Sequence, residues 1–389
     1  MTLFGILLTV FVIVNIGNAL HKGGDFAAFL EGGLRFLTGT RLYEGSLPGA
    51  GVIGPPFQSL WFSPFALIAG LHVGIARILW YSINIVCFFA GIWCWTQAIL
   101  PGRFSSAREL WSAPQVLWPL AAIALPAETN FEHQNMNALL LFLTGAGALA
   151  LIRSTHGRAT ALLGTAVALK AFPAMLLGAL FSRRFWKMAI AAGSLALGLS
   201  LLAAFRYGVH GAFVTLQDWM RISVTGGWPT RPQNQSLFAA LSRWVPDAAA
   251  TAYSIAWPAL VGLVAGVAWK RRHLSNLKAG PDVAFALAVA VVLSPIAWEH
   301  YWVLIYPILQ ATYVAGSKRS RFRLAAFWIA AGLITGPSPM IVGRFGYDLA
   351  RDWASSTIAA LLLIGALTPA LLATEVPLIE LASGTEKTV

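Results

Sequence analysis

The sequence predicts an all-α, polytopic integral membrane protein, and three observations lead to this class. Of the 389 residues, 58% are hydrophobic and only 11% are charged, whereas a soluble domain carries about 25% charged residues. Apolar runs suited to transmembrane helices recur from end to end. Short clusters of Lys and Arg separate the runs, as in cytoplasmic loops of membrane proteins. We therefore expect one transmembrane domain over residues 1–389, without a soluble appendage.

The charge and the cysteines exclude several other classes. The formal net charge is +12, but the basic residues lie in loops where membrane topology accounts for them, so we expect no nucleic-acid partner. Cys87 and Cys94 are seven residues apart on one apolar run, too far for a CxxC redox pair and unfavourable for a disulfide. The sequence has no Walker loop, no GxSxG motif and no metal-ligand spacing. We expect no cofactor. The several acidic residues do not exclude a divalent metal ion, but no motif supports one.

Basic clusters set the predicted topology. Five of them hold 15 of the 27 Lys and Arg, at residues 103–108, 153–158, 183–187, 270–278 and 318–323. We assign these five loops to the cytoplasmic face of the membrane, because Lys and Arg concentrate in short loops on that side. The polar stretch that follows the first apolar run then faces outward.

The N-terminal part is predicted to hold one span and a long outer loop. Thr2 to Leu20 is long enough to cross a bilayer and reads as a retained anchor rather than a cleaved signal. From the outer loop to the basic loop at 103–108, the chain must cross an odd number of times. We therefore predict that Phe57 to Leu71 lies along the outer interface and that Gly74 to Leu100 crosses. The outer loop with its interfacial helix thus covers residues 21–73.

The middle of the chain predicts a broken span. Only 24 residues, 159–182, separate two basic loops, which is too few for two full spans but enough for two half-length helices. They would meet at Lys170, Phe172 and Pro173, because proline interrupts helices. The other predicted spans are 114–127, 135–152, 187–205, 249–269, 282–298, 301–316, 323–336 and 353–373, for a total of about 10–13 transmembrane helices. The predicted outer loops are 126–137, 206–247 and 336–352, and the tail 374–389 is expected to be loose and cytoplasmic.

Asp25 is the main catalytic candidate. It follows Gly23 and Gly24 at the mouth of the first span, where an ionisable residue often marks a functional site. A carboxylate in a partly desolvated position can accept the proton of an attacking hydroxyl. Asp25 is equally suited to cap the helix predicted from FAAFLEGGLRFL, and the residues alone leave both interpretations open.

Charged candidates for a phosphate or sugar site lie at breaks and outer turns. Lys170 can pair with a phosphate at the helix break, or its side chain can extend to the interface. Glu299 and His300, in SPIAWEHYW, can bind a phosphate, orient a sugar or move a proton, or they can anchor the turn. Arg231 is a further candidate for phosphate oxygens.

Amides and one histidine are candidates for sugar or acceptor hydroxyls. They are His133, Gln134, Asn135 and Asn137 in EHQNMN, and Asn234 and Gln235 in NQSLF. Such side chains hydrogen-bond to hydroxyl groups. Each alone is more typical of a solvated loop, but all are predicted on one face of the membrane.

Motifs spread along most of the chain occur in this order: GGDF, RLYEG, PPFQSLWFSPFALI, HQNMNALLLFL, ALKAFPAMLLGALFSRRFW, NQSLFAALSRW and LSPIAWEHYWVLIYPIL. In these the chain resembles glycosyltransferase family 87. The resemblance implies a C-type glycosyltransferase fold and a polyprenyl-phosphate sugar donor, typically mannose. It implies Asp25 as general base, with Lys170 and His300 near the donor phosphate or reacting sugar. Gly54, where the family commonly has an aromatic residue, and His133, where it has glycine, depart from the pattern and bear on the sugar or acceptor.

The predicted function is an inverting sugar transfer on the outer face of the cytoplasmic membrane. A polyprenyl-phosphate sugar, with mannose expected, is the donor, and a glycolipid or glycan is the acceptor. The alternative from another class is a carrier or flippase for a lipid-linked or anionic solute, which would be expected to show an inverted repeat that we do not find in the sequence. A membrane acyltransferase is a weaker alternative, since only His300 supports it, and a purely structural membrane protein would leave the polar residues on one face unexplained.

Overall fold

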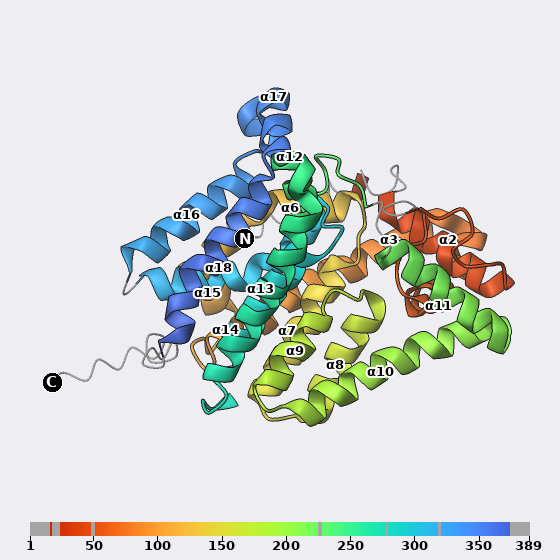
Figure 1. Cartoon of the computed structure of the whole chain (residues 1–389), viewed down its shortest axis with the longest axis horizontal. Coiled ribbons are helices and arrows are strands. Elements are labelled where there is room, and N and C mark those ends of the chain that lie inside the picture. The colour runs from red at the N-terminus through yellow and green to blue at the C-terminus, as the bar shows by residue number, and fades with distance from the viewer. Residues whose placement is uncertain are drawn as a thin grey trace.

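The computed structural model describes residues 16–17, 24–47, 51–224, 228–276, 279–317 and 320–373. Over these ranges the chain forms α-helices and short 3-10 segments, with one isolated β-bridge and no β-sheet (Figure 1). The predicted all-α class is therefore confirmed. Most of the predicted first span and the tail 374–389 lie outside the described residues.

The first described helices reproduce the predicted break after the outer loop. Helix α2 covers Gly24–Thr38, and α3 covers Pro56–Ile99. Helix α3 leaves helical geometry at His72, where φ is −159° and ψ is 106°. This break falls between the two predicted segments, Phe57 to Leu71 and Gly74 to Leu100. The orientation of the first segment along the membrane surface stays a prediction.

The predicted half-length helices are also present. Helix α8 (His156–Leu169) and helix α9 (Ala174–Ser182) flank a non-helical turn, in which Lys170 is extended. Pro173 is the N-cap of α9. A proline is tolerated at the start of a helix but not in its interior, so the sequence itself determines that the chain breaks here and that Lys170 lies at the break.

Two predicted outer loops are helical instead. The range 206–247 contains α11 (Gly208–Val224) and α12 (Leu237–Trp244), and the range 336–352 contains α17 (Pro339–Asp352). These helices mix apolar and charged residues, so their average hydropathy hides them from a search for membrane spans. The sequence analysis placed no helices in these ranges, and their position on the outer face stays a prediction.

The predicted span 114–127 is wrong as one helix. It divides at Ile123 into α5 (Pro114–Ala122) and α6 (Ala124–Glu132). Pro126 has no N–H for the carbonyl of Ala122, four residues earlier. The hydroxyl of Thr335 donates to that carbonyl at 2.8 Å instead, so a distant helix satisfies the group that the proline leaves unpaired.

The remaining elements include helices in the other predicted spans, together with α4 and the 3-10 segments, which were not predicted. They are α4 (Ala107–Ser112), α7 (Asn137–Ile152), α10 (Trp186–Ala204), α13 (Ala249–Lys270), α14 (Gly280–Leu293), α15 (Tyr306–Ser317), α16 (Arg321–Thr335) and α18 (Ser355–Leu372), with 3-10 segments η1 (Phe205–Tyr207), η2 (Pro246–Ala248) and η4 (Glu299–Ile305). In the described part of the chain, four helices are long and apolar enough to cross a membrane, or five if the pair α16–α17, bent by 87°, is one span. The predicted count of about 10–13 is therefore not confirmed.

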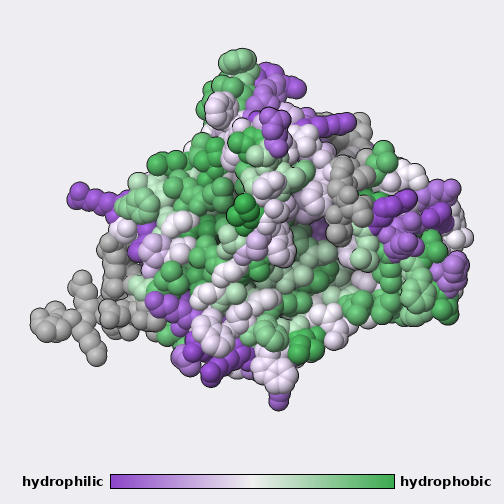
Figure 2. All heavy atoms as spheres, in the orientation of Figure 1, coloured by the Kyte–Doolittle hydropathy of each residue, from purple (hydrophilic) through white to green (hydrophobic). Residues whose placement is uncertain are grey.

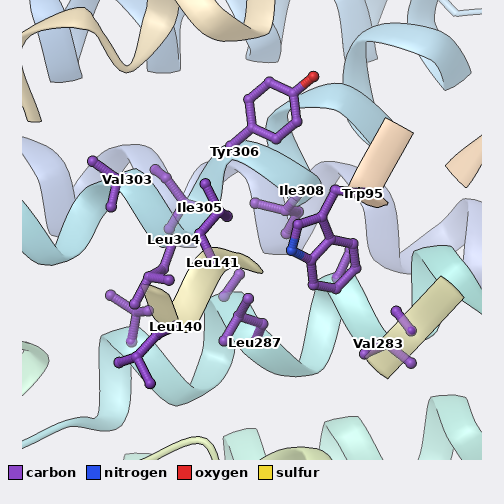
Figure 3. Packing of buried hydrophobic residues seen from close by; sticks show 14 of the residues in the cluster. Trp95, Leu140, Leu141, Val283, Leu287, Val303, Leu304, Ile305, Tyr306 and Ile308 are labelled. Atoms are coloured by element: carbon purple, nitrogen blue, oxygen red, sulfur yellow. The ribbon is translucent and has the colours of Figure 1, made fainter. Parts of the chain in front are cut away.

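The core is built around α14, whose residues are all buried. Leu140, Leu287 and Ile305, from α7, α14 and η4, are buried in the same hydrophobic cluster (Figure 3). Large apolar side chains also remain on the outside, including Leu71 at 90% exposure and Phe213 at 71%. Hydrophobic residues cover much of one face, whereas hydrophilic residues gather toward its edges (Figure 2). An apolar exterior of this extent marks a membrane protein.

Basic loops meet at one end of the helix bundle. The guanidinium of Arg183 donates to the carbonyls of Leu274 and Ser275, and the amide of Asn276 donates to the hydroxyl of Ser154 at 3.2 Å. Three of the loops that we assigned to the cytoplasmic face thus touch one another. Helices α12 and α17 lie at the opposite end of the bundle (Figure 1).

Candidate active site

Asp25 is placed by a close contact between α2 and the turn before α7. Its backbone N–H donates to the carbonyl of His133 at 3.0 Å. Gly24 has φ of +47°, and a Cβ there would lie 2.6 Å from the same carbonyl oxygen. Only glycine allows this approach without strain. The contact directs the Asp25 carboxylate toward Asn135, whose side-chain amide donates to Oδ2 at 2.7 Å.

Aromatic packing holds α2 in this position. Phe26, next to Asp25, is fully buried against Phe62 and Trp80 of α3, with ring centroids 6.2 and 6.1 Å away. The indole N–H of Trp80 donates to the carbonyl of Gln134 at 2.7 Å. Helices α2 and α3 and the turn at 133–135 are therefore fixed together, and the Asp25 carboxylate, 34% exposed, stays accessible.

Lys170 lies on the other side of Asn135. Its Nζ donates to Oδ1 of Asn137 at 2.9 Å and to Oδ1 of Asn135 at 3.3 Å. The same Nζ lies 3.6 Å from the centre of the Tyr301 ring. These partners are neutral, and among the described residues no carboxylate contacts Nζ directly. Asn135 links the carboxylate and the lysine of the site, since its side chain donates to Asp25 and accepts from Lys170.

His300 completes the cluster. Its Nε2 lies 3.2 Å from Oδ2 of Asp25, out of line for a hydrogen bond, and its backbone carbonyl accepts from the side chain of Asn137 at 3.0 Å. The rings of His133 and Tyr301 lie 5.6 and 5.3 Å away. In this turn between two helices, burial lowers the pKa of His300 to about 3, although the nearby Asp25 acts in the opposite direction. The imidazole is therefore neutral at pH 7.

A cavity of about 630 Å³ opens beside this cluster. Asp25, Asn135 and Lys170 form its polar end. Its remaining walls are largely apolar and include Phe172, Met175, Trp219, Ile222, Trp257 and Leu293. A polar end with an apolar wall suits a ligand that has a charged head and a hydrocarbon chain. Within the described ranges, no three His, Cys, Asp or Glu side chains group as a metal site.

Glu299 and Arg231 do not reach the cavity. Glu299 turns away toward α17, where Oε1 lies 2.8 Å from Nε of Arg351 and Oε2 accepts from the Tyr347 hydroxyl at 2.7 Å. Burial raises the pKa of Glu299, and Arg351 partly offsets this. Arg231 is exposed and lies outside the cavity lining.

Asn234 and Gln235 hold the turn that carries His300. Oδ1 of Asn234 accepts from the N–H of Ala297 at 2.9 Å, and its amide donates to the carbonyl of Pro295 at 3.0 Å. Gln235 donates from its backbone to Ala297 and from its side chain to the carbonyl of Arg351, at 2.8 and 2.9 Å. These contacts are internal to the protein, so both residues support the site rather than line it.

Of the predicted EHQNMN residues, Asn137 is within the cluster, while His133 and Gln134 contribute their backbone carbonyls. Asn135, which the sequence also placed among the candidate amides of this turn, is the central residue of the cluster, and its Oδ1 accepts the Asn137 N–H at 3.2 Å. Tyr301, beside His300, was missed, since a buried aromatic residue is more typical of a core.

Comparison with known proteins identifies the family of the chain. The model of glycosyltransferase family 87 matches residues 53–307, a range that includes Asn135, Lys170 and His300 but not Asp25. The protein is thus a membrane glycosyltransferase. The chain belongs to glycosyltransferase family 87.

Similar sequences come from mycobacteria. The chain is 26% identical over 338 residues to the polyprenol-phosphate-mannose-dependent alpha-(1-2)-phosphatidylinositol mannoside mannosyltransferase of Mycobacterium tuberculosis, covering 81% of this chain and 76% of the relative. A protein of the same description from Mycolicibacterium smegmatis is 25% identical over 294 residues, covering 72% of this chain and 65% of the relative. The chain therefore spans slightly less than two thirds of this second relative. No solved structure matches.

Proposed function

We propose that this protein transfers mannose from a polyprenyl-phosphate donor to a glycolipid on the outer face of the cytoplasmic membrane, with Asp25 as general base. The observation that carries the proposal is the link Asp25–Asn135–Lys170 at the polar end of an apolar cavity. The donor follows from the descriptions of the relatives, which name polyprenol-phosphate-mannose dependence. The rival carrier would need no such pairing of a base with a phosphate-binding cation.

In the proposed reaction the acceptor hydroxyl gives its proton to Asp25 while its oxygen attacks the anomeric carbon. The bond from that carbon to the phosphate oxygen breaks, and the phosphate keeps the electron pair. Lys170 stabilises the charge that develops on this phosphate, because a fixed cation in a partly dry site acts strongly on developing charge. The neutral His300 packs beside Asp25 and orients it.

A single displacement with inversion follows from the carboxylates available. Asp25 is the one carboxylate among the described residues that line the cavity. Retaining enzymes that act on glycosidic bonds use a second carboxylate as nucleophile. Lys170 supplies the charge that a metal ion would otherwise supply, so we propose a reaction that needs no metal.

The acceptor is proposed to be a membrane-anchored mannoside. The relatives' descriptions name phosphatidylinositol mannoside as the acceptor. Two residues that depart from the family pattern lie where an acceptor would be selected, because Gly54 lines the cavity and the ring of His133 lies beside that of His300. The outward position of the site follows from the basic loops at the opposite end of the bundle.

The test is a transfer assay in nanodiscs with radiolabelled polyprenyl-phosphate mannose and a membrane lipid extract. We expect Asp25→Asn to lower turnover by about 10²–10⁴-fold, with donor binding retained. Asp247→Asn, an exposed acid in η2, is the matched control and should behave as the wild type. Wild-type turnover in Asp25→Asn would show that another group is the base.

A further inference from the structure

Glu299 is adjacent to the site in sequence but is held by a helix outside it. Its two carboxylate oxygens contact Arg351 and Tyr347, at 2.8 and 2.7 Å. The guanidinium carbon of Arg351 also lies 4.7 Å from the centre of the Tyr347 ring. We call Glu299, Tyr347 and Arg351 the Glu299 clamp.

The clamp is more enclosed than an ordinary surface ion pair. The side chains of Glu299 and Arg351 are 15% and 13% exposed, whereas Arg344 and Asp348, a pair on the same helix, are 81% and 49% exposed. Exposed pairs are loosely held and contribute little. The Tyr347 hydroxyl fixes the direction of one carboxylate oxygen by a hydrogen bond. Nε of Arg351 is not aligned for a hydrogen bond, so Arg351 holds Glu299 by the attraction of opposite charges at close range. Together the two contacts constrain the backbone from which Glu299 extends.

That backbone is the one that positions His300. Glu299 and His300 are consecutive residues of η4, with Glu299 directed to α17 and His300 directed to Asp25. Nε2 of His300 has no aligned hydrogen bond within the described residues. The imidazole is therefore located by its backbone and by neighbouring rings, and a shift of the turn would move it relative to Asp25.

We propose that Arg351 and Tyr347 are positioning residues, which hold Glu299 and thereby set the distance between His300 and Asp25 in the reactive complex. This inference rests on the proposed function, in which Asp25 is the base. Neither Arg351 nor Tyr347 lines the cavity beside Asp25. Their loss should therefore slow the chemical step and leave donor binding largely unchanged.

The experiment compares variants on α17. Arg351→Gln should lower kcat about tenfold, because small misplacements of catalytic groups have large effects on rate. Tyr347→Phe, which removes one hydroxyl, should lower kcat about threefold, and both should leave the donor KM within about twofold of wild type. Arg351→Lys should recover part of kcat. Arg344→Gln removes the same charge from the same helix without touching Glu299, and should match the wild type.

The other results would overturn the inference. Wild-type kcat in folded Arg351→Gln and Tyr347→Phe would show that the clamp does not position the site. A raised donor KM with unchanged kcat would make Glu299 part of donor binding instead. If Arg351→Gln does not fold, Tyr347→Phe decides, since its ring remains. Asp25→Asn, assayed in parallel, separates the proposed function from the proposed role of the clamp. Wild-type turnover in Asp25→Asn would refute Asp25 as the base, whereas the role of Arg351 and Tyr347 would still be decided by their own variants.

Discussion

Replacing Lys170 by methionine tests the proposed phosphate site directly. An ammonium group has three N–H donors, and in this structure Asn135 and Asn137 accept two hydrogen bonds from Nζ. The remaining donor can point to a ligand in the cavity. Methionine keeps an unbranched apolar chain but removes the charge, so the variant isolates the contribution of the ammonium group.

The expected magnitude follows from the lost contact. A hydrogen bond to a charged group contributes about 1.5–3 kcal/mol, which corresponds to a rise of about 10–150-fold in the Kd for the donor. Turnover should fall further, because the charge on the leaving phosphate is greater in the transition state than in the bound donor. Lys170→Met should therefore raise the donor Kd and also lower kcat.

Equilibrium binding of radiolabelled polyprenyl-phosphate mannose in nanodiscs measures the first effect, and single-turnover transfer measures the second. Lys187→Met is the matched control, because Lys187 is exposed, lies 5.5 Å from the Trp186 ring and is outside the cavity. If folded Lys170→Met binds the donor within about twofold of the wild type, Lys170 does not bind the phosphate and the reasoning from the cavity fails.

Two further predictions concern the support of the site and of the fold. Gly24→Ala places a Cβ 2.6 Å from the His133 carbonyl oxygen, at a residue with positive φ. Transfer activity should therefore fall about tenfold or more. The control is Gly262→Ala, which has open space around it and should match the wild type. Asp282→Asn leaves two buried guanidinium groups without their shared carboxylate, which should cost about 3–5 kcal/mol of unfolding free energy. Thermal unfolding of that variant against the exposed control Asp247→Asn checks this, and equal melting temperatures would contradict it.

The sequence predicted the features that depend on local chemistry. Low charge and long apolar runs predicted an all-helical membrane protein. The shortness of the segment around Lys170, with Pro173 behind it, predicted a pair of short helices with a lysine at their junction. The break in α3 near His72 was predicted from the charges of the loops, because the chain must cross the membrane an odd number of times between an outer and a cytoplasmic loop.

The length and hydropathy of apolar runs did not predict the amphipathic helices. Helices α11 and α17 mix apolar and polar residues, and the sequence analysis assigned their ranges to outer loops. The effect of Pro126 was underestimated, because the predicted span 114–127 is divided into two helices. A hydroxyl from α16 donates to the backbone carbonyl that the proline leaves without a partner. A hydrogen-bond partner of this kind is distant in the sequence, so hydropathy and residue spacing cannot predict it.

By itself the sequence determined which polar residues were available at the outer turns, because each follows a recognisable apolar run. Only the tertiary structure decided which of them meet. Asn135 lies 110 positions from Asp25 in the chain, yet donates to its carboxylate, whereas Glu299, next to His300, turns to Arg351 instead. The direction of a side chain at a turn is set by the neighbours that can bond or neutralise it, and here those neighbours come from other helices.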